Sequence, residues 1–148
     1  MNFIAAVILA VCKGNEDEAF TIFTSLMEDT SFGDYFHREM NFEALQEDTA
    51  KIKQKLVSVD AELVEHLNKI GFDLSSVTPA WLLTCFFLPI GPCKTMHVMD
   101  NIMRMGKNAR RWLINETTVT FLERRRALFA CTDLSEIHRT FRRRIDLK

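Results

Sequence analysis

The sequence predicts an all-α protein, and three observations support this fold class. Only 5 glycines and 3 prolines interrupt 148 residues, while residues that favour helices are abundant. Apolar residues recur at spacings of three and four along much of the chain. No useful length alternates with the period of two that is typical of strands. At this length we expect one domain with a single continuous core.

The first twelve residues, MNFIAAVILAVC, are nearly all apolar. They are too few to span a bilayer, which takes about 20 apolar residues. A secretory signal needs a positive segment before the apolar run, and here only Asn2 stands between Met1 and that run. We therefore expect the first buried helix of a domain. A small secreted or lipid-anchored helical protein, with this stretch as its signal, is the alternative.

Caps and breakers divide the first half of the chain. Asn15 and Glu18 form a capping-box pattern ahead of an amphipathic stretch, which predicts a helix over about 16–28. Gly71 follows a helical apolar pattern and occupies the position typical of a helix end. The other expectations are a loop over 30–34, a helix over 42–56, and a further helix from a break near Ser58 to Ile70.

The second half begins with an apolar segment. Thr78 and Pro79 resemble an N-cap followed by proline at the first helical position. The run AWLLTCFFL over 80–88 is apolar nearly all round, which predicts a central buried helix that ends at Pro89-Ile90-Gly91-Pro92. Further helices are expected over about 94–105 (ending at Gly106), 112–130 and 133–144, the last with a capping pattern at Asp133 and Glu136.

The sulfur-containing side chains are expected to serve packing. The cysteines show no C-x-x-C pair and three lie in apolar runs, which indicates buried reduced thiols. Cys93 and His97 are four residues apart, but no second ligand pair accompanies them, so we predict neither a metal site nor a cofactor. The methionines of the stretch 96–103 favour adaptable core packing over a binding groove. The cysteines are Cys12, Cys85, Cys93 and Cys131.

Charge is distributed unevenly along the chain. Residues 1–103 hold 7 Lys and Arg against 15 Asp and Glu, and residues 104–148 hold 12 against 5. The two parts should therefore attract each other or separate partners. The clusters at 124–126 and 142–144 are interleaved with only one aromatic residue, Phe141. This favours a solvated face or an acidic protein partner over nucleic acid.

Common catalytic motifs do not occur in the sequence. It contains no G-x-G-x-x-G, Walker A, H-E-x-x-H or G-x-S-x-G pattern. The four histidines are scattered without a useful carboxylate or thiolate arrangement, and we expect surface or core-edge imidazoles.

Several stretches, taken in order, resemble one known family. They are GNEDEAFTIFTSLME, Tyr35-Phe36, LQED at 45–48, ELVEHLNKIGFDLSSVTPAWLLTCF, HVMDNIMRMG and ALFACTDLSEIHRTF. The third long stretch aligns with a family motif R-I-W-D-I-F-L-x-E-G at Asp100 and Gly106, with Met99 in place of tryptophan and Met105 in place of glutamate. Together they resemble the TBC domain, a helical family of GTPase-activating proteins for Rab GTPases.

The resemblance implies a multi-helix right-handed array that is incomplete at its N-terminus. It covers about the C-terminal two-thirds of the family's domain. We expect one partial TBC-like domain over 1–148, with core helices over about 1–130 and a basic C-terminal helix over 131–148. The expected partner is a small GTPase of the Rab type.

The resemblance also bears on catalysis. In the family, a catalytic-glutamine motif Y-x-Q-G runs directly into M-N-F-x-A-A, and a catalytic arginine lies further upstream in I-x-x-D-x-x-R. Neither is in this chain, so we expect it to be inactive alone and name no catalytic residue. Arg104 and Arg110 are the nearest arginines, and we expect both to be surface charges. The motif residues assigned to GTPase binding or to the motif core are Asn2, Phe3, Trp81, Phe86, Asp100 and Gly106.

A non-catalytic module that binds a GTPase or an adaptor is the second hypothesis. A first helix that is apolar all round predicts exposed apolar surface and self-association. We expect no membrane span, no nucleic-acid partner, and a cytoplasmic location that is peripheral to endomembranes.

Overall fold

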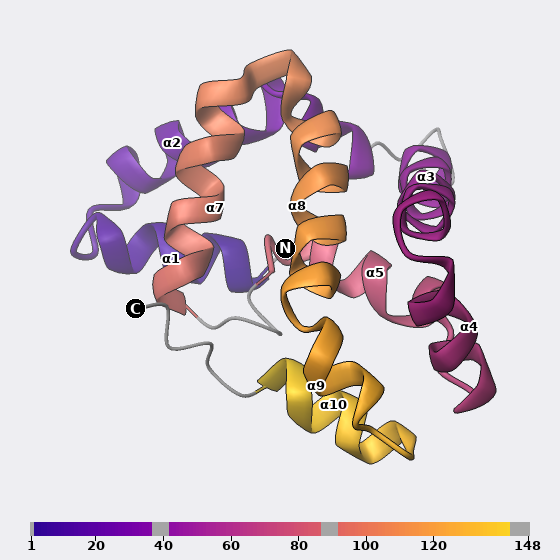
Figure 1. Ribbon diagram of the computed structural model, residues 1–148. Helices are drawn as coiled ribbons and strands as arrows, with labels where there is room; N and C mark the ends of the chain where they lie inside the picture. Colours follow the sequence, from indigo (N-terminus) through magenta and orange to yellow (C-terminus); the bar gives the residue numbers. More distant parts are fainter. Residues whose placement is uncertain (1, 37–41, 87–91, 143–148) are drawn as a thin grey trace.

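The described residues of the protein form an assembly of helices. The computed structural model describes residues 2–36, 42–86 and 92–142, with side chains for 3–36, 42–86 and 95–141. Every regular element in these ranges is a helix, which confirms the predicted all-α class. In Figure 1, α7 and α8 stand side by side, with α1 and α2 on one side of them and α3, α4 and α5 on the other.

The first two helices form a hairpin. α1 spans Asn2–Val11 and α2 spans Glu16–Glu28. The Asn15 side chain accepts a hydrogen bond from the Glu18 N–H at 3.2 Å, which confirms the predicted cap. Only part of α1 is buried, since Ile4 is 1% exposed and Val11 is 53% exposed. The predicted buried helix is therefore present, with an uncovered side.

A 3-10 helix, η1, replaces the loop predicted over 30–34. It spans Ser31–Phe36, and its aromatic side chains Phe32 and Tyr35 are buried in the core. A Cβ at Gly33 would lie 1.8 Å from the Met27 carbonyl oxygen. The glycine therefore allows this turn to approach α2 closely enough to bury its aromatic residues.

Two helices follow with a single residue between them. α3 spans Glu43–Val59 and α4 spans Ala61–Lys69, so the break predicted near Ser58 lies at Asp60. The Asp60 carboxylate accepts a hydrogen bond from the Leu63 N–H at 3.1 Å and caps α4. The predicted stop at Gly71 is confirmed by its φ of +82°.

The start predicted at Thr78 and Pro79 is wrong. α5 spans Leu74–Leu83 and encloses Pro79. Asp73 supplies the cap, since its carboxylate accepts a hydrogen bond from the Ser75 N–H at 3.0 Å. The Thr78 hydroxyl instead donates to the Leu74 carbonyl within the helix at 2.8 Å.

The helix predicted over 80–88 is also shorter than expected. α5 ends at Leu83, and Cys85 and Phe86 adopt left-handed backbone angles. These two side chains are at most 1% exposed, so their burial in the core outweighs the cost of the unfavourable φ. Residues 87–91, which include most of the predicted stop, lie outside the described residues.

The remaining helices complete the array. The helix predicted over 112–130 is divided at Arg124, and the last helix is capped by Asp133, whose carboxylate accepts from the Glu136 N–H at 2.9 Å. Residues 143–148 lie outside the described residues. The elements are α7 (Pro92–Met105), η3 (Gly106–Asn108), α8 (Ala109–Glu123), α9 (Arg125–Phe129) and α10 (Leu134–Arg142).

An aromatic cluster joins α5, α8 and α10. The Trp81 ring stacks on Phe121 at 5.3 Å between centroids and meets Phe141 edge-on at 4.7 Å. Phe121 and Phe141 are 5.1 Å apart. Such ring pairs add to the free energy gained from burial. The predicted buried thiols are confirmed at Cys12, Cys85 and Cys131, whereas the Cys93 side chain lies outside the described residues.

Replacing Phe121 by alanine should lower the free energy of unfolding by about 3–5 kcal/mol, because it leaves a cavity in the centre of the aromatic cluster. Urea denaturation followed by circular dichroism measures this change. The control is Val57→Ala at an exposed position of α3, for which we expect a change within about 0.5 kcal/mol. If both substitutions lowered the free energy of unfolding equally, the aromatic cluster would not be central to the stability of the core.

Candidate functional site

The motif residues named by the sequence do not form one site. Trp81 and Phe86 are 4% and 1% exposed, and their rings lie 6.0 Å apart inside the aromatic core. Phe3, by contrast, is 49% exposed in the first turn of α1. Asp100 is exposed on α7. Trp81 and Phe86 thus serve packing, and the exposed residues lie on two separate helices.

The structure places Asn2 and Gly106 by their backbone atoms. Asn2 is the first residue of α1, and its side chain is outside the described set. Gly106 begins η3, the turn between α7 and α8, with a φ of +51°. A Cβ there would meet only the Asp29 carbonyl oxygen at 3.9 Å. The left-handed backbone, and not a lack of space, therefore favours glycine at this turn.

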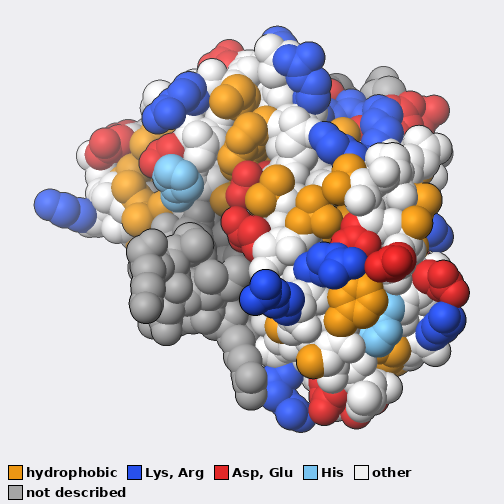
Figure 2. Space-filling view, viewed as in Figure 1, with side chains coloured by type: hydrophobic (Ala, Val, Ile, Leu, Met, Phe, Trp, Pro, Cys, Tyr) orange, Lys and Arg blue, Asp and Glu red, His pale blue; other side chains and the backbone are white. Residues whose placement is uncertain are grey.

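An apolar groove lies among α1, α2 and α7. Its volume is about 180 Å³. Figure 2 shows hydrophobic side chains over these helices at the left of the face in view, beside acidic side chains and a histidine. The lining residues are Val7, Ile8, Val11, Ile22, Leu26, Met96, Met99, Asp100 and Met103.

The methionines of α7 divide between the core and the groove. Met99 is 7% exposed, in agreement with the predicted core packing. Met96 and Met103 are 41% and 38% exposed and line the groove, so the core-packing prediction is wrong for these two. The α1–α2 hairpin leaves this side of α7 uncovered, which the methionine spacing alone does not reveal.

Asp100 is the charged residue among those that line the groove. Within the described part of the chain it makes no ion pair at 4.0 Å or less. The flanking α1–α2 hairpin adds four acidic residues, Glu16, Asp17, Glu18 and Glu28, against one basic residue, Lys13. The groove is thus lined by apolar side chains and one carboxylate, and the hairpin beside it carries an excess of acidic residues.

Arg110 of α8 is held in an ion-pair network with α3 and η1. Its Nε donates to Asp48 Oδ2 at 2.6 Å and an Nη donates to Asp48 Oδ1 at 3.0 Å, a two-pronged contact. The other Nη reaches Asp34 at 3.2 Å. The Tyr35 hydroxyl donates to Asp48 Oδ2 at 2.9 Å. The expected surface charge is therefore wrong for Arg110, whose side chain is only 21% exposed.

Comparison with known proteins identifies the family of this helical domain. A family model, the Rab-GTPase-TBC domain, matches residues 1–128. The chain belongs to this family. No curated protein and no solved structure matches. The matched range runs from α1 into α9 and leaves α10 outside. TBC domains act as GTPase activators on Rab GTPases.

The ion-pair network around Arg110 shifts the pKa values of Asp48 and Tyr35. Burial alone would raise the pKa of Asp48, but hydrogen bonds from Arg110, Lys51 and Tyr35 more than offset this and lower it. Burial, followed by the negative charge of Asp48, raises the pKa of Tyr35. Arg110 therefore stays charged and bound to Asp48. Within this TBC domain its guanidinium therefore joins α8 to α3 and η1.

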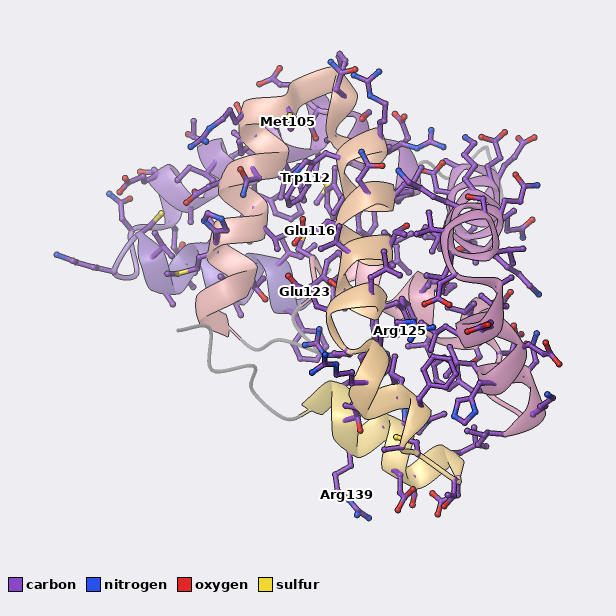
Figure 3. The ribbon with its side chains drawn as sticks, viewed as in Figure 1. Met105, Trp112, Glu116, Glu123, Arg125 and Arg139 are labelled. Carbon is purple, nitrogen blue, oxygen red and sulfur yellow. The ribbon has the colours of Figure 1, made fainter. Side chains whose placement is uncertain are left out.

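The arginine cluster at 124–126 also serves packing. Arg125 pairs with Asp60 and, at 3.2 Å, with Glu62, and Figure 3 shows it beside α4. Arg124 is 6% exposed and donates to the Thr120 carbonyl at 3.1 Å. The predicted solvated face is thus wrong for Arg124, whereas the Arg125 side chain stays 44% exposed and Arg126 is exposed. The side chains of the cluster at 142–144 lie outside the described residues.

Sequence reasoning missed an acidic seam between α7 and α8. Trp112, Glu116 and Glu123 lie on the side of α8 that faces α7 (Figure 3). Burial, then the charge of Glu123, raises the pKa of the half-buried Glu116, and His97 partly opposes this. The seven-residue spacing of the two glutamates is the signal that could have revealed the seam.

The described ranges hold neither a metal-binding cluster nor a membrane-spanning helix. They contain no group of three or more His, Cys, Asp or Glu side chains placed to hold a metal ion. Among the same residues, no helix combines the length and apolar character needed to cross a bilayer.

Arg110→Met should lower the free energy of unfolding at pH 7 by up to about 3 kcal/mol, because the buried Asp48 carboxylate would lose its two-pronged contact and keep only Lys51 and Tyr35 as donors. The folded-state pKa of Asp48 lies below its unfolded value of about 3.9. The stabilisation is therefore complete above that value and is lost as the pH falls through the folded-state pKa. The difference between variant and wild type should narrow in acid.

Urea denaturation at neutral pH and below pH ~4 measures this difference. Arg111→Met, at the exposed neighbouring position, is the control and should change stability by less than about 0.5 kcal/mol. A loss for Arg110→Met that is the same at both pH values would show that charge is not its cause.

Proposed function

We propose that this TBC domain binds a Rab-type GTPase without itself accelerating GTP hydrolysis. The match to the Rab-GTPase-TBC family over residues 1–128 is the observation that carries the binding part of this proposal. The exposed start of α1 supplies a surface for that contact.

The absence of acceleration follows from the chemistry of GTP hydrolysis. An arginine stabilises the charge on the transferring phosphoryl group, and a positioned glutamine orients the attacking water. The 148 residues contain neither a Y-x-Q nor an I-x-x-D-x-x-R motif. Arg110, an arginine near a family motif, is bound to Asp48. We therefore name no catalytic residue in this chain.

Asn2 and Phe3 are the proposed GTPase contacts. They lie in the first turn of α1, and the resemblance places the family's glutamine motif directly before them. Phe3 exposes about half of its surface, and aromatic side chains often supply much of the binding energy at interfaces. Trp81, Phe86 and Gly106 are assigned to the fold and not to the contact.

We propose a cytoplasmic location that is peripheral to endomembranes. The family's Rab partners support this location.

Phe3→Ala should weaken GTPase binding at least fivefold, as expected for the loss of an aromatic anchor worth more than about 1 kcal/mol. The measurement is titration of the chain against a panel of GTP-loaded and GDP-loaded Rab GTPases. Phe20→Ala, which removes a more exposed phenylalanine from α2, is the matched control. No binding to any member of the panel would refute the proposal, and faster GTP hydrolysis would refute its non-catalytic part.

We also propose that the chain self-associates through the uncovered side of α1. Leu9, which does not line the groove among α1, α2 and α7, is 39% exposed, and exposed apolar surface favours association. Sedimentation velocity should show a mean mass that rises with concentration, and Leu9→Ser should reduce this rise. Val57→Ser on α3 should leave it unchanged. A single monomer peak at all concentrations would overturn the proposal.

A further inference from the structure

We infer that the groove among α1, α2 and α7 docks a basic amphipathic helix of a partner protein. The groove involves the second half of α1, whereas the proposed GTPase contact lies in its first turn. The inference therefore goes beyond GTPase binding and does not depend on it.

The size of the groove favours side chains over a small molecule. Small-molecule sites occupy about 300–1,000 Å³, and this groove holds about 180 Å³. A helix that lies in an apolar groove inserts side chains from positions i, i+3 or i+4, and i+7. Three helices line the groove, with Val7 and Val11 on one wall, Ile22 on the next and Met103 on the third. A volume of this size accommodates the anchoring side chains of such a helix.

The methionines give the groove an adaptable wall. Met96 and Met103 are partly exposed, while Met99 is 7% exposed beneath them. Unbranched thioether side chains repack easily around an incoming apolar group, and methionine is common at surfaces that bind helices. The groove can therefore accept Leu, Ile or Phe anchors without a fixed shape.

The acidic residues near the groove indicate that the partner helix carries positive charge. Asp100 lies among the lining residues, and Glu16, Asp17 and Glu18 stand exposed in the first turn of α2. Arg104 and Lys13 are the exposed basic residues nearest in sequence to these groups. The acidic excess favours a helix with Lys or Arg on both sides of its apolar face. The same acidic groups would repel an anionic lipid surface.

A second copy of this chain is a poor occupant for two reasons. A second copy that placed its own α1–α2 hairpin in the groove would bring like charges together, unlike one that associates through Leu9 outside the groove. The chain's own basic amphipathic helix, α10, already buries Ile137 and Phe141 in its own core, at 0% and 4% exposure. Its apolar face is therefore unavailable to a neighbouring molecule.

The test uses two designed, helix-stabilised peptides with the same leucine anchors. One carries lysines beside the apolar face and the other carries glutamates at the same positions. Fluorescence anisotropy with the full chain should show tighter binding of the lysine peptide, and added salt should reduce its advantage. Equal affinity of both peptides, or no binding of either, would overturn the inference.

Two variants locate the binding site. Met103→Lys should weaken the lysine peptide about tenfold, because it places a charge against the apolar anchors. Asp100→Lys should weaken it about two- to fivefold, as expected for one exposed ion pair, and should improve binding of the glutamate peptide. Val57→Lys on α3 is the matched control. Unfolding curves verify that each variant is folded, and unchanged peptide binding by Met103→Lys would place the site elsewhere.

The inference and the proposed function can fail separately. Phe3→Ala should leave peptide binding unchanged, and Met103→Lys should leave Rab binding unchanged. If Met103→Lys abolishes self-association while the lysine peptide neither binds nor competes with it, the groove is an interface between copies of the chain. That outcome would overturn the docking of a basic partner helix.

Discussion

The contact between Arg110 and Asp48 fixes the relative positions of three elements. Arg110 comes from α8, Asp48 from α3, and the Tyr35 hydroxyl of η1 completes the contact. Because Asp48 is buried, its charge is tolerable only while these donors stay in place. This constraint holds η1 against the core and so orients α2, which precedes it, and α8, whose aromatic face receives Trp81. The ion pair lies outside the groove, and η1 directly follows α2, which forms one of the groove walls.

The family motifs of this TBC domain mainly supply residues that pack in the core or permit a turn. Trp81 and Phe86 fill the core, and Gly106 permits the turn into α8. Their side chains or backbone angles are determined by the fold, and none of them presents a reactive group to a partner. Phe3 and Asp100 are instead exposed, as are Met96 and Met103 of α7.

Local signals in the sequence predicted much of the fold. The caps at Asn15 and Asp133 and the stop at Gly71 were predicted correctly because each depends on a few neighbouring residues. The start of α5 was misassigned because Asp73 competes with Thr78 for the cap.

The rest of the fold and site requires contacts between residues far apart in sequence. Arg110 meets Asp48 across 62 positions, and nothing near either residue reveals the other. The resemblance correctly named the family, but it did not separate buried motif residues from exposed ones. Burial is set by the whole array and not by the motif. The groove likewise forms between three helices, and their spacing in the sequence does not indicate that they lie together.

The exposed methionines have a chemical consequence of their own. Oxidation of a thioether to the sulfoxide adds a polar oxygen and a chiral centre to a flexible apolar side chain. Met96 and Met103 lie at the groove surface, where an oxidant can reach them, whereas Met99 is shielded beneath them. Oxidative conditions would therefore make the groove polar while leaving the core intact. Reductase repair reverses this change, so the groove of this helical array is sensitive to the redox state of its surroundings.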